Sequence, residues 1–143
     1  MISPDLIVIN GTRILSRDTL SALSMPVLNT HVGITPGYRG VHGAYWALAN
    51  NDPEHCGVTV HLVDAGIDTG TILHQALIHP TAKDNITTYP TMQMTVGSQL
   101  LCQAVAEVLE GRHKELPAPP GNARWNHPTL LEYVRNLIRT GVR

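Results

Sequence analysis

The chain has 143 residues, of which 43% are hydrophobic, and a formal net charge of −1 at pH 7. This suits one domain with a modest core, and it argues against a protein that grips nucleic acid through a basic surface. The apolar runs are too short to cross a bilayer and the N-terminus lacks the pattern of a secretory signal, so we expect a cytoplasmic protein with neither membrane nor nucleic-acid partners.

The first 31 residues predict a strand–helix–strand unit. Residues 4–11 (PDLIVING) form a continuous apolar run that ends in Asn-Gly, which predicts a buried parallel strand. A short helix is expected over residues 16–23, and residues 25–31 (MPVLNTH) predict a second buried strand. Such sheets bind ligands beyond the carboxyl ends of their strands, where Asn29 and His31 fall.

The middle of the chain predicts a helix and two further strands. After a Gly/Pro loop at residues 32–40, a helix is expected over residues 41–50. Residues 57–63 and 71–80 predict two strands joined by the loop DAGIDTG, residues 64–70. These two strands should form a hairpin-like pair that follows the parallel strands.

The C-terminal part begins with the longest predicted helix, residues 89–110. Its apolar residues keep a helical spacing and should face the sheet: Met92, Val96, Leu100, Ala104 and Val108. Residues 116–128 predict an extended linker, and residues 128–139 a final helix. The whole pattern is that of an α/β fold, with parallel strands, a hairpin-like strand pair and helices on the faces.

Metal binding is not expected. Cys56 and Cys102 match neither a zinc-binding spacing nor a redox-active Cys-x-x-Cys pair. Several histidines also lack any ligand spacing, namely His55, His74, His79, His113 and His127. We therefore expect two unpaired thiols in a reducing compartment and no metal.

Three polar residues stand at a strand end or in the facing loop: Asn29, His31 and Asp68. N–H groups of an Asn and a His can stabilise an oxygen that gains negative charge, and an opposing carboxylate can accept a proton or keep the His protonated. These roles suit acyl transfer to an amine, which needs no side-chain nucleophile. On spacing alone, structural roles explain the same residues: Asn29 closing a turn, His31 bonded to backbone, and Asp68 shaping a loop.

Three stretches in this order resemble the catalytic half of the 10-formyltetrahydrofolate-dependent formyltransferases: PDLIVINGTRILS, LNTHVGITPGYRGVHGAYWAL and GVTVHLVDAGIDTGTIL. That family includes glycinamide ribonucleotide transformylase, methionyl-tRNA formyltransferase and the sugar N-formyltransferases. The resemblance implies that Asn29, His31 and Asp68 are catalytic. It also implies a partial Rossmann-like formyltransferase fold in which the pteridine ring of folate contacts Arg13, Ile14, Leu15, Asp64, Ala65, Gly66 and Ile67.

The chain departs from the family pattern in two ways. Proline and serine usually follow the catalytic His, but Val32 and Gly33 stand here, and we expect Gly33 to loosen the loop and enlarge the acceptor side. The resemblance covers a half-domain, expected at residues 1–111, followed by a C-terminal linker and helix at 112–143. The family's N-terminal half has no counterpart, so we expect a fragment or a chain that needs a partner.

The missing half would leave an open sheet edge beside the strand at residues 4–11. Unpaired backbone groups and apolar surface at such an edge recruit another strand. We therefore expect a homo-oligomer or a separate N-terminal chain that covers this edge. Arg39 has two interpretations: it grips a carboxylate or phosphate of a substrate, or it bonds carbonyl groups of its own loop.

The resemblance implies an N-formyltransferase that moves a formyl group from 10-formyltetrahydrofolate to a primary amine of a small molecule. An aminosugar or glycinamide-type acceptor is favoured over tRNA because the chain lacks basic charge. Two alternatives stay open. One is a formyltetrahydrofolate hydrolase, in which water is the acceptor, and the other is a non-catalytic, truncated formyltransferase-like module.

Overall fold

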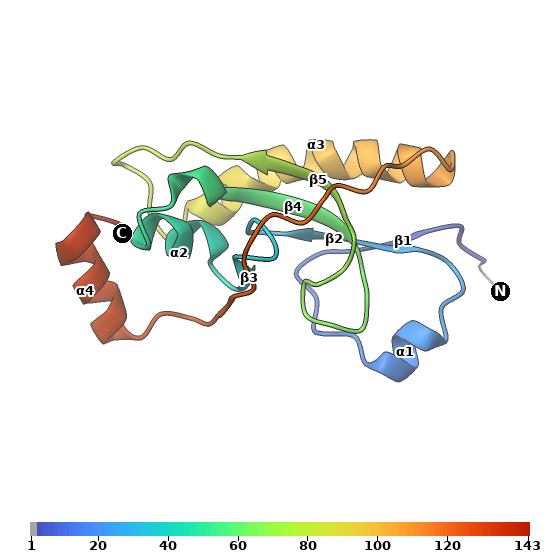
Figure 1. The fold of residues 1–143 in the computed structure, drawn as a ribbon, viewed down its shortest axis with the longest axis horizontal. Helices are drawn as coiled ribbons and strands as arrows, with labels where there is room; N and C mark the ends of the chain where they lie inside the picture. The colour runs from blue at the N-terminus through green and yellow to red at the C-terminus, as the bar shows by residue number, and fades with distance from the viewer. Residues whose placement is uncertain (1–2) are drawn as a thin grey trace.

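A four-stranded sheet lies at the centre of the fold, which a computed structural model describes for residues 3–143 (Figure 1). The strand order is β1-β2-β4-β5; β1 is parallel to β2, whereas β4 is antiparallel to both β2 and β5. The strands are β1 Ile7–Ile9, β2 Val27–His31, β4 Gly57–Leu62 and β5 Ile72–Leu77. The predicted α/β fold, with parallel strands followed by a hairpin-like pair, is confirmed.

The predicted helices form within a few residues of their expected bounds. They are α1 Arg17–Ser21, α2 Gly43–Ala49, α3 Tyr89–Leu109 and α4 Leu130–Thr140, with a short 3₁₀ helix at Pro53–His55. The side chain of Ser16 accepts a hydrogen bond from the backbone N–H of Thr19 and so caps α1. Within the described residues, no helix has both the length and the hydropathy needed to cross a membrane.

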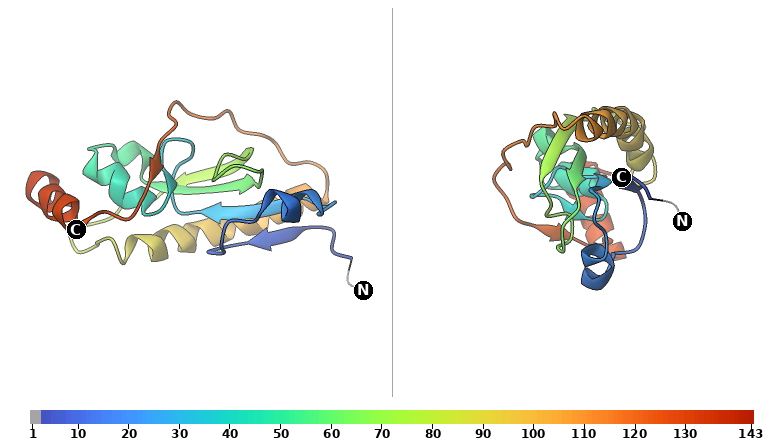
Figure 2. Two further views of the ribbon diagram at one scale, coloured as in Figure 1. Left: turned by 90° about the horizontal axis from the view of Figure 1, so that it is seen from below. Right: turned by 90° about the vertical axis from the view of Figure 1, so that its right-hand side faces the viewer.

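Helix α3 packs along one face of the sheet and builds much of the core (Figure 2). Ala104 is fully buried against Leu28, Val60 and Leu73, and Leu100 and Val108 pack against the same group. Met92 and Val96 pack against a second cluster that surrounds α2. The five apolar residues predicted to face inward therefore do so.

Strand β1 is not the buried strand that its apolar sequence predicted. Val8 is 43% exposed, while Ile7 and Ile9 are only half-buried. The reason is its place in the sheet, because β1 has β2 on one side and, among residues 3–143, no strand on the other. The expectation that another chain covers this edge stays a prediction.

A second, two-stranded sheet brings the C-terminal segment back to the first half of the chain. Strand β3, Arg39–Gly40, pairs in parallel with β6, Arg124–Trp125. The ring of Trp125 stacks on Tyr38 and Trp46, with centroid separations of 5.9 and 4.8 Å. The segment expected to be a linker thus packs on the loop that follows β2, although the boundary predicted after residue 111 stays a prediction.

Candidate active site

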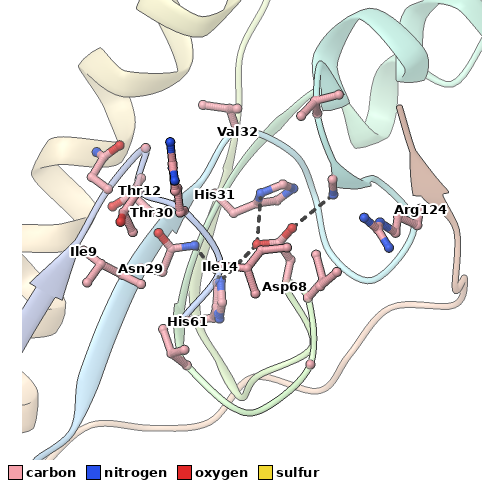
Figure 3. A pocket seen from close by; sticks show the side chains of 18 of the residues that line it. Ile9, Thr12, Ile14, Asn29, Thr30, His31, Val32, His61, Asp68 and Arg124 are labelled. Atoms are coloured by element: carbon pink, nitrogen blue, oxygen red, sulfur yellow. Dashed lines mark hydrogen bonds and ion pairs between the residues drawn. The ribbon is translucent and has the colours of Figure 1, made fainter. Parts of the chain in front are cut away.

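A cavity of about 530 Å³ opens beyond the carboxyl ends of β1 and β2. This volume lies within the usual range for small-molecule sites, roughly 300–1,000 Å³. Asn29, His31 and Asp68 all line it, and Figure 3 shows their polar atoms gathered together with those of His61. The structure therefore brings the three predicted residues into one site, while their catalytic role stays a prediction.

Asn29 is held by His61, which faces it across the β2–β4 pairing. The backbone carbonyl of Leu62 lies 3.0 Å from His61 Nδ1, so Nδ1 carries the hydrogen and donates it. Burial lowers the pKa of His61, which keeps its other nitrogen, Nε2, free to accept. Nε2 lies 3.2 Å from Asn29 Nδ2, so the amide donates one hydrogen to it and keeps a second hydrogen for a ligand.

His31 is buried and contacts a different partner through each ring nitrogen. Nε2 lies 2.8 Å from the backbone carbonyl of Tyr38, to which it donates. Nδ1 faces Asp68, with 3.4 Å between Nδ1 and Oδ1. This separation is longer than a good hydrogen bond. It is still short enough for the ring nitrogen and the carboxylate to contact the same small ligand group.

Asp68 is fixed by a backbone N–H of strand β3. It has a left-handed backbone with φ of 51°, which an Asp tolerates better than a bulky residue. Its Oδ2 accepts a hydrogen bond of 3.0 Å from the backbone N–H of Gly40. Gly40 itself has φ of 92°, and a Cβ there would lie 2.2 Å from the carbonyl oxygen of Trp125. The pairing of β3 with β6 thus helps to position the carboxylate.

Gly33 lies where the loop after β2 packs tightly, which argues against the expectation that it loosens the loop. The expectation that it enlarges the acceptor side stays a prediction. It is buried, and a Cβ at this position would lie 2.2 Å from the carbonyl oxygen of Tyr38 and 2.8 Å from His31 Nε2. In this backbone an added Cβ would displace the carbonyl or the imidazole, so glycine suits the hydrogen bond between them.

The residues predicted to contact folate lie mainly along the cavity wall. Those that line it are Arg13, Ile14, Leu15, Asp64, Gly66 and Ile67. Ala65 belongs to the same loop but is exposed and does not line the cavity. Ile14 is 68% exposed, which leaves a large aliphatic side chain uncovered at the cavity. These contacts with folate stay a prediction.

Residues 1–105 match the family model described as "Formyl transferase". The chain belongs to the formyl transferase family. Among curated relatives, the methionyl-tRNA formyltransferase of Bacteroides fragilis is 30% identical over 152 residues, which cover 93% of this chain and 47% of the relative. That of Thermodesulfovibrio yellowstonii is 32% identical over 145 residues, covering 93% of this chain and 46% of the relative. The chain thus spans about half the length of these relatives.

Solved structures of formyltransferases share the fold. PseJ of Anoxybacillus kamchatkensis, in complex with UDP-4,6-dideoxy-4-formamido-L-AltNAc and tetrahydrofolate, has a TM-score of 0.75 and 23% identity, over 92% of this chain and 69% of that one. Glycinamide ribonucleotide transformylase 1 of Symbiobacterium toebii has a TM-score of 0.68 and 25% identity, over 79% of this chain and 57% of that one.

In this member of the family, Arg39 bonds groups of other segments and not carbonyls of its own loop, and its buried Nε has no partner within residues 3–143. A role for Arg39 in gripping a substrate stays a prediction. Nη1 donates to the carbonyl oxygen of Ile67 at 3.2 Å, and Nη2 donates to Asn122 Oδ1 at 2.6 Å. Arg39 thus joins the loop that carries Asp68 to the C-terminal segment. Between residues 3 and 143, no group of three or more His, Cys, Asp or Glu side chains is placed to hold a metal.

His42 and His127 form a second polar pair beside the cavity. His42 Nε2 lies 2.9 Å from His127 Nδ1, and both residues line the wall. Burial, reinforced by the charge of His127, lowers the pKa of His42. The folded protein therefore binds a proton at His42 less readily than the unfolded chain does.

Acid is expected to destabilise the protein through His42 and His61, whose pKa values are both lowered in the fold. Their contribution is complete above the unfolded pKa of about 6.5 and is lost as the pH falls through the lower folded values. We expect His42→Asn, which suits the left-handed backbone with φ of 57°, to lose less stability on acidification. Urea unfolding between about pH 7.5 and pH 5 checks this, and equal losses in both proteins would contradict it.

Proposed function

We propose that this chain carries the catalytic site of an N-formyltransferase. The reaction moves a formyl group from 10-formyltetrahydrofolate to a primary amine of a small molecule. The observation that supports it most strongly is the arrangement of Asn29, His31 and Asp68 around one cavity, with His31 Nδ1 3.4 Å from Asp68 Oδ1. Membership of the formyl transferase family supports the same reaction.

Each of the three side chains has a role that its contacts allow. Asn29 keeps one amide hydrogen free beside its contact with His61, and it directs that hydrogen at the oxygen that gains negative charge when an amine attacks the formyl carbon. His31, when protonated, donates from Nδ1 toward the same region, because its Nε2 is bonded to the carbonyl of Tyr38. Asp68 stabilises that charged imidazole and accepts the proton that leaves the amine. When the oxyanion collapses, the bond between the formyl carbon and N10 of the folate breaks, and this proton passes to the released N10.

The cavity suits a flat, partly apolar ring such as the pterin of a folate. Ile9, Ile14, Val63 and Ile67 supply aliphatic walls, and polar backbone from the loops after β1 and β4 lies between them. When bound there, the folate supplies the formyl group. PseJ was solved with tetrahydrofolate, and the N-formyltransferase of Helicobacter canadensis with folinic acid.

Replacing Ile14 with Asp is expected to weaken binding of 5-formyltetrahydrofolate by roughly 10- to 100-fold, because burying one aliphatic side chain contributes about 1.5–3 kcal/mol. Ile14 is 68% exposed without a ligand, so the change should leave the fold intact. Titration calorimetry measures the affinity. Leu109→Asp alters an exposed leucine that does not line the cavity and should bind like wild type. If Ile14→Asp binds with unchanged affinity, the folate does not contact Ile14 and the proposed binding position is wrong.

The acceptor we propose is a small amine of the aminosugar or glycinamide type. The net charge of −1 does not favour an acceptor as large and anionic as tRNA, although the curated relatives at 30% and 32% identity are methionyl-tRNA formyltransferases. The fold neighbours include proteins solved with sugar nucleotides. We also infer that another chain covers the free edge of β1.

Incubation with 10-formyltetrahydrofolate and a panel of amines tests this function, with products identified by mass spectrometry. The panel contains aminosugars, their nucleotide derivatives, glycinamide derivatives and a charged methionyl-tRNA. A formylated small amine is the expected product. Free formate from every reaction would indicate a hydrolase instead, and folate binding without turnover would indicate a non-catalytic module.

A further inference from the structure

Helix α4 turns its apolar face away from the rest of the protein. The exposed side chains on this face are Leu130, Leu131, Val134, Leu137 and Ile138. At about 100° per residue they share an arc of roughly 120° on one side of the helix. Leu130, Leu131 and Ile138 are 80%, 78% and 81% exposed, so this apolar stripe is uncovered.

The face of α4 that touches the protein is polar instead. Asn136 is buried and donates from Nδ2 to the hydroxyl of Tyr45 at 3.2 Å, and Arg139 Nη2 donates to the carbonyl oxygen of Ala49 at 2.7 Å. Tyr133 stacks on Tyr45 with a centroid separation of 6.0 Å. A surface helix normally buries its apolar face and exposes its polar one, and α4 does the reverse.

Local contacts fix the two ends of α4, and hydrogen bonds along its length set its orientation. Thr129 and Glu132 form a capping box at its N-terminus, and Gly141 ends it in a left-handed conformation. The polar face of α4 is hydrogen-bonded to Tyr45 and Ala49 of α2. Rotating α4 to bury its leucines would therefore break those bonds. The apolar stripe is therefore a fixed surface feature.

We propose that the apolar stripe of α4 is the contact of a symmetric homodimer. It offers on the order of 500 Å² of aliphatic surface per copy, at the upper end for the largest patch on a monomer. Two copies together would bury roughly 1,000 Å², the threshold for a specific contact. The stripe holds no charge or hydrogen-bonding group, so it is complementary to itself across a two-fold axis.

A membrane surface fits this stripe less well than a second copy does. A helix that lies on a bilayer has basic residues along its borders and a polar face in water. Here Arg135 is the one basic residue beside the stripe, and the polar face is held against α2. Figures 1 and 2 place α4 at the opposite end of the molecule from β1, so an α4 dimer leaves the β1 edge free.

Sedimentation equilibrium at micromolar concentration tests the proposal. Wild type should have twice the mass of the 15.6 kDa chain. Leu131→Glu combined with Ile138→Glu should weaken the dimer at least 100-fold and give a folded monomer, because each charge enters the contact twice. Leu109→Glu is the matched control, because it places the same charge at an exposed leucine on α3, and it should stay dimeric. A monomeric wild type would overturn the proposal, as would a dimer that survives the α4 changes and is lost in Val8→Glu on β1.

Cross-linking supplies a second readout that needs no destabilising charge. On a Cys102→Ser background, Val134→Cys places a thiol in the middle of the stripe, close to its copy across the two-fold axis. Mild oxidation should give a covalent dimer. Leu109→Cys on the same background is the matched control, and cross-linking no stronger at position 134 than at 109 would place the contact elsewhere.

Discussion

Replacing Asp68 with asparagine is expected to lower the rate of formyl transfer by about two to four orders of magnitude, the usual contribution of a positioned acid or base. Asparagine keeps the shape, tolerates the left-handed backbone and still accepts the hydrogen bond from the N–H of Gly40. It cannot take up the amine's proton or place a negative charge beside His31 Nδ1. Single-turnover measurements with saturating amine should show the loss, while calorimetry should show folate affinity within a few-fold of wild type.

Asp5→Asn is the matched control, because Asp5 is exposed and does not line the cavity. It should transfer formyl groups at the wild-type rate. Transfer by Asp68→Asn at that same rate would remove Asp68 from the mechanism.

Gly33→Ala is expected to destabilise the fold by about 1–3 kcal/mol, the usual cost of overpacking. The added Cβ would lie 2.2 Å from the carbonyl oxygen of Tyr38 and 2.8 Å from His31 Nε2, so the loop must move and His31 loses its fixed orientation. Transfer activity should fall even at a temperature where the variant is fully folded. Urea unfolding gives the stability, and activity is measured on the same samples.

Gly37→Ala, in the same loop, separates this effect from the ordinary effect of replacing a glycine. The two atoms nearest to a Cβ added at Gly37 would lie 3.9 and 4.0 Å from it, so the methyl group fits without displacing its neighbours. We expect wild-type activity and stability within about 0.5 kcal/mol of wild type, as for most surface changes. If Gly33→Ala behaves the same way, the close approach of Tyr38 to His31 is not needed.

Elements with a strong local pattern could be predicted from the sequence. The apolar spacing of α3 predicted both its length and the face it buries. Strand β2 was predicted by its apolar run, and its end brought Asn29 and His31 to the cavity. The position of Asp68 in the facing loop made it a candidate, but the resemblance was needed to favour a catalytic role, since a carboxylate in a Gly-rich loop between two strands has many possible structural roles.

Features that depend on distant pairings could not be predicted. The contact of Asn29 with His61 follows from the antiparallel register of β2 and β4, which the two segments do not specify separately. The support of Asp68 by Gly40 depends on β6, which pairs with β3 from the far end of the chain. Strand β1 looked buried because its composition cannot tell an edge strand from a central one.

The most direct test of the account is a crystal structure of the chain with 5-formyltetrahydrofolate. We predict the pterin against the backbone of residues 13–15 and the loop at 64–70. The formyl group should lie near Asn29, His31 and Asp68, with its oxygen about 3 Å from Asn29 Nδ2 or His31 Nδ1. A folate bound outside this cavity, or inside it with the formyl group turned away from all three side chains, would contradict the proposed site.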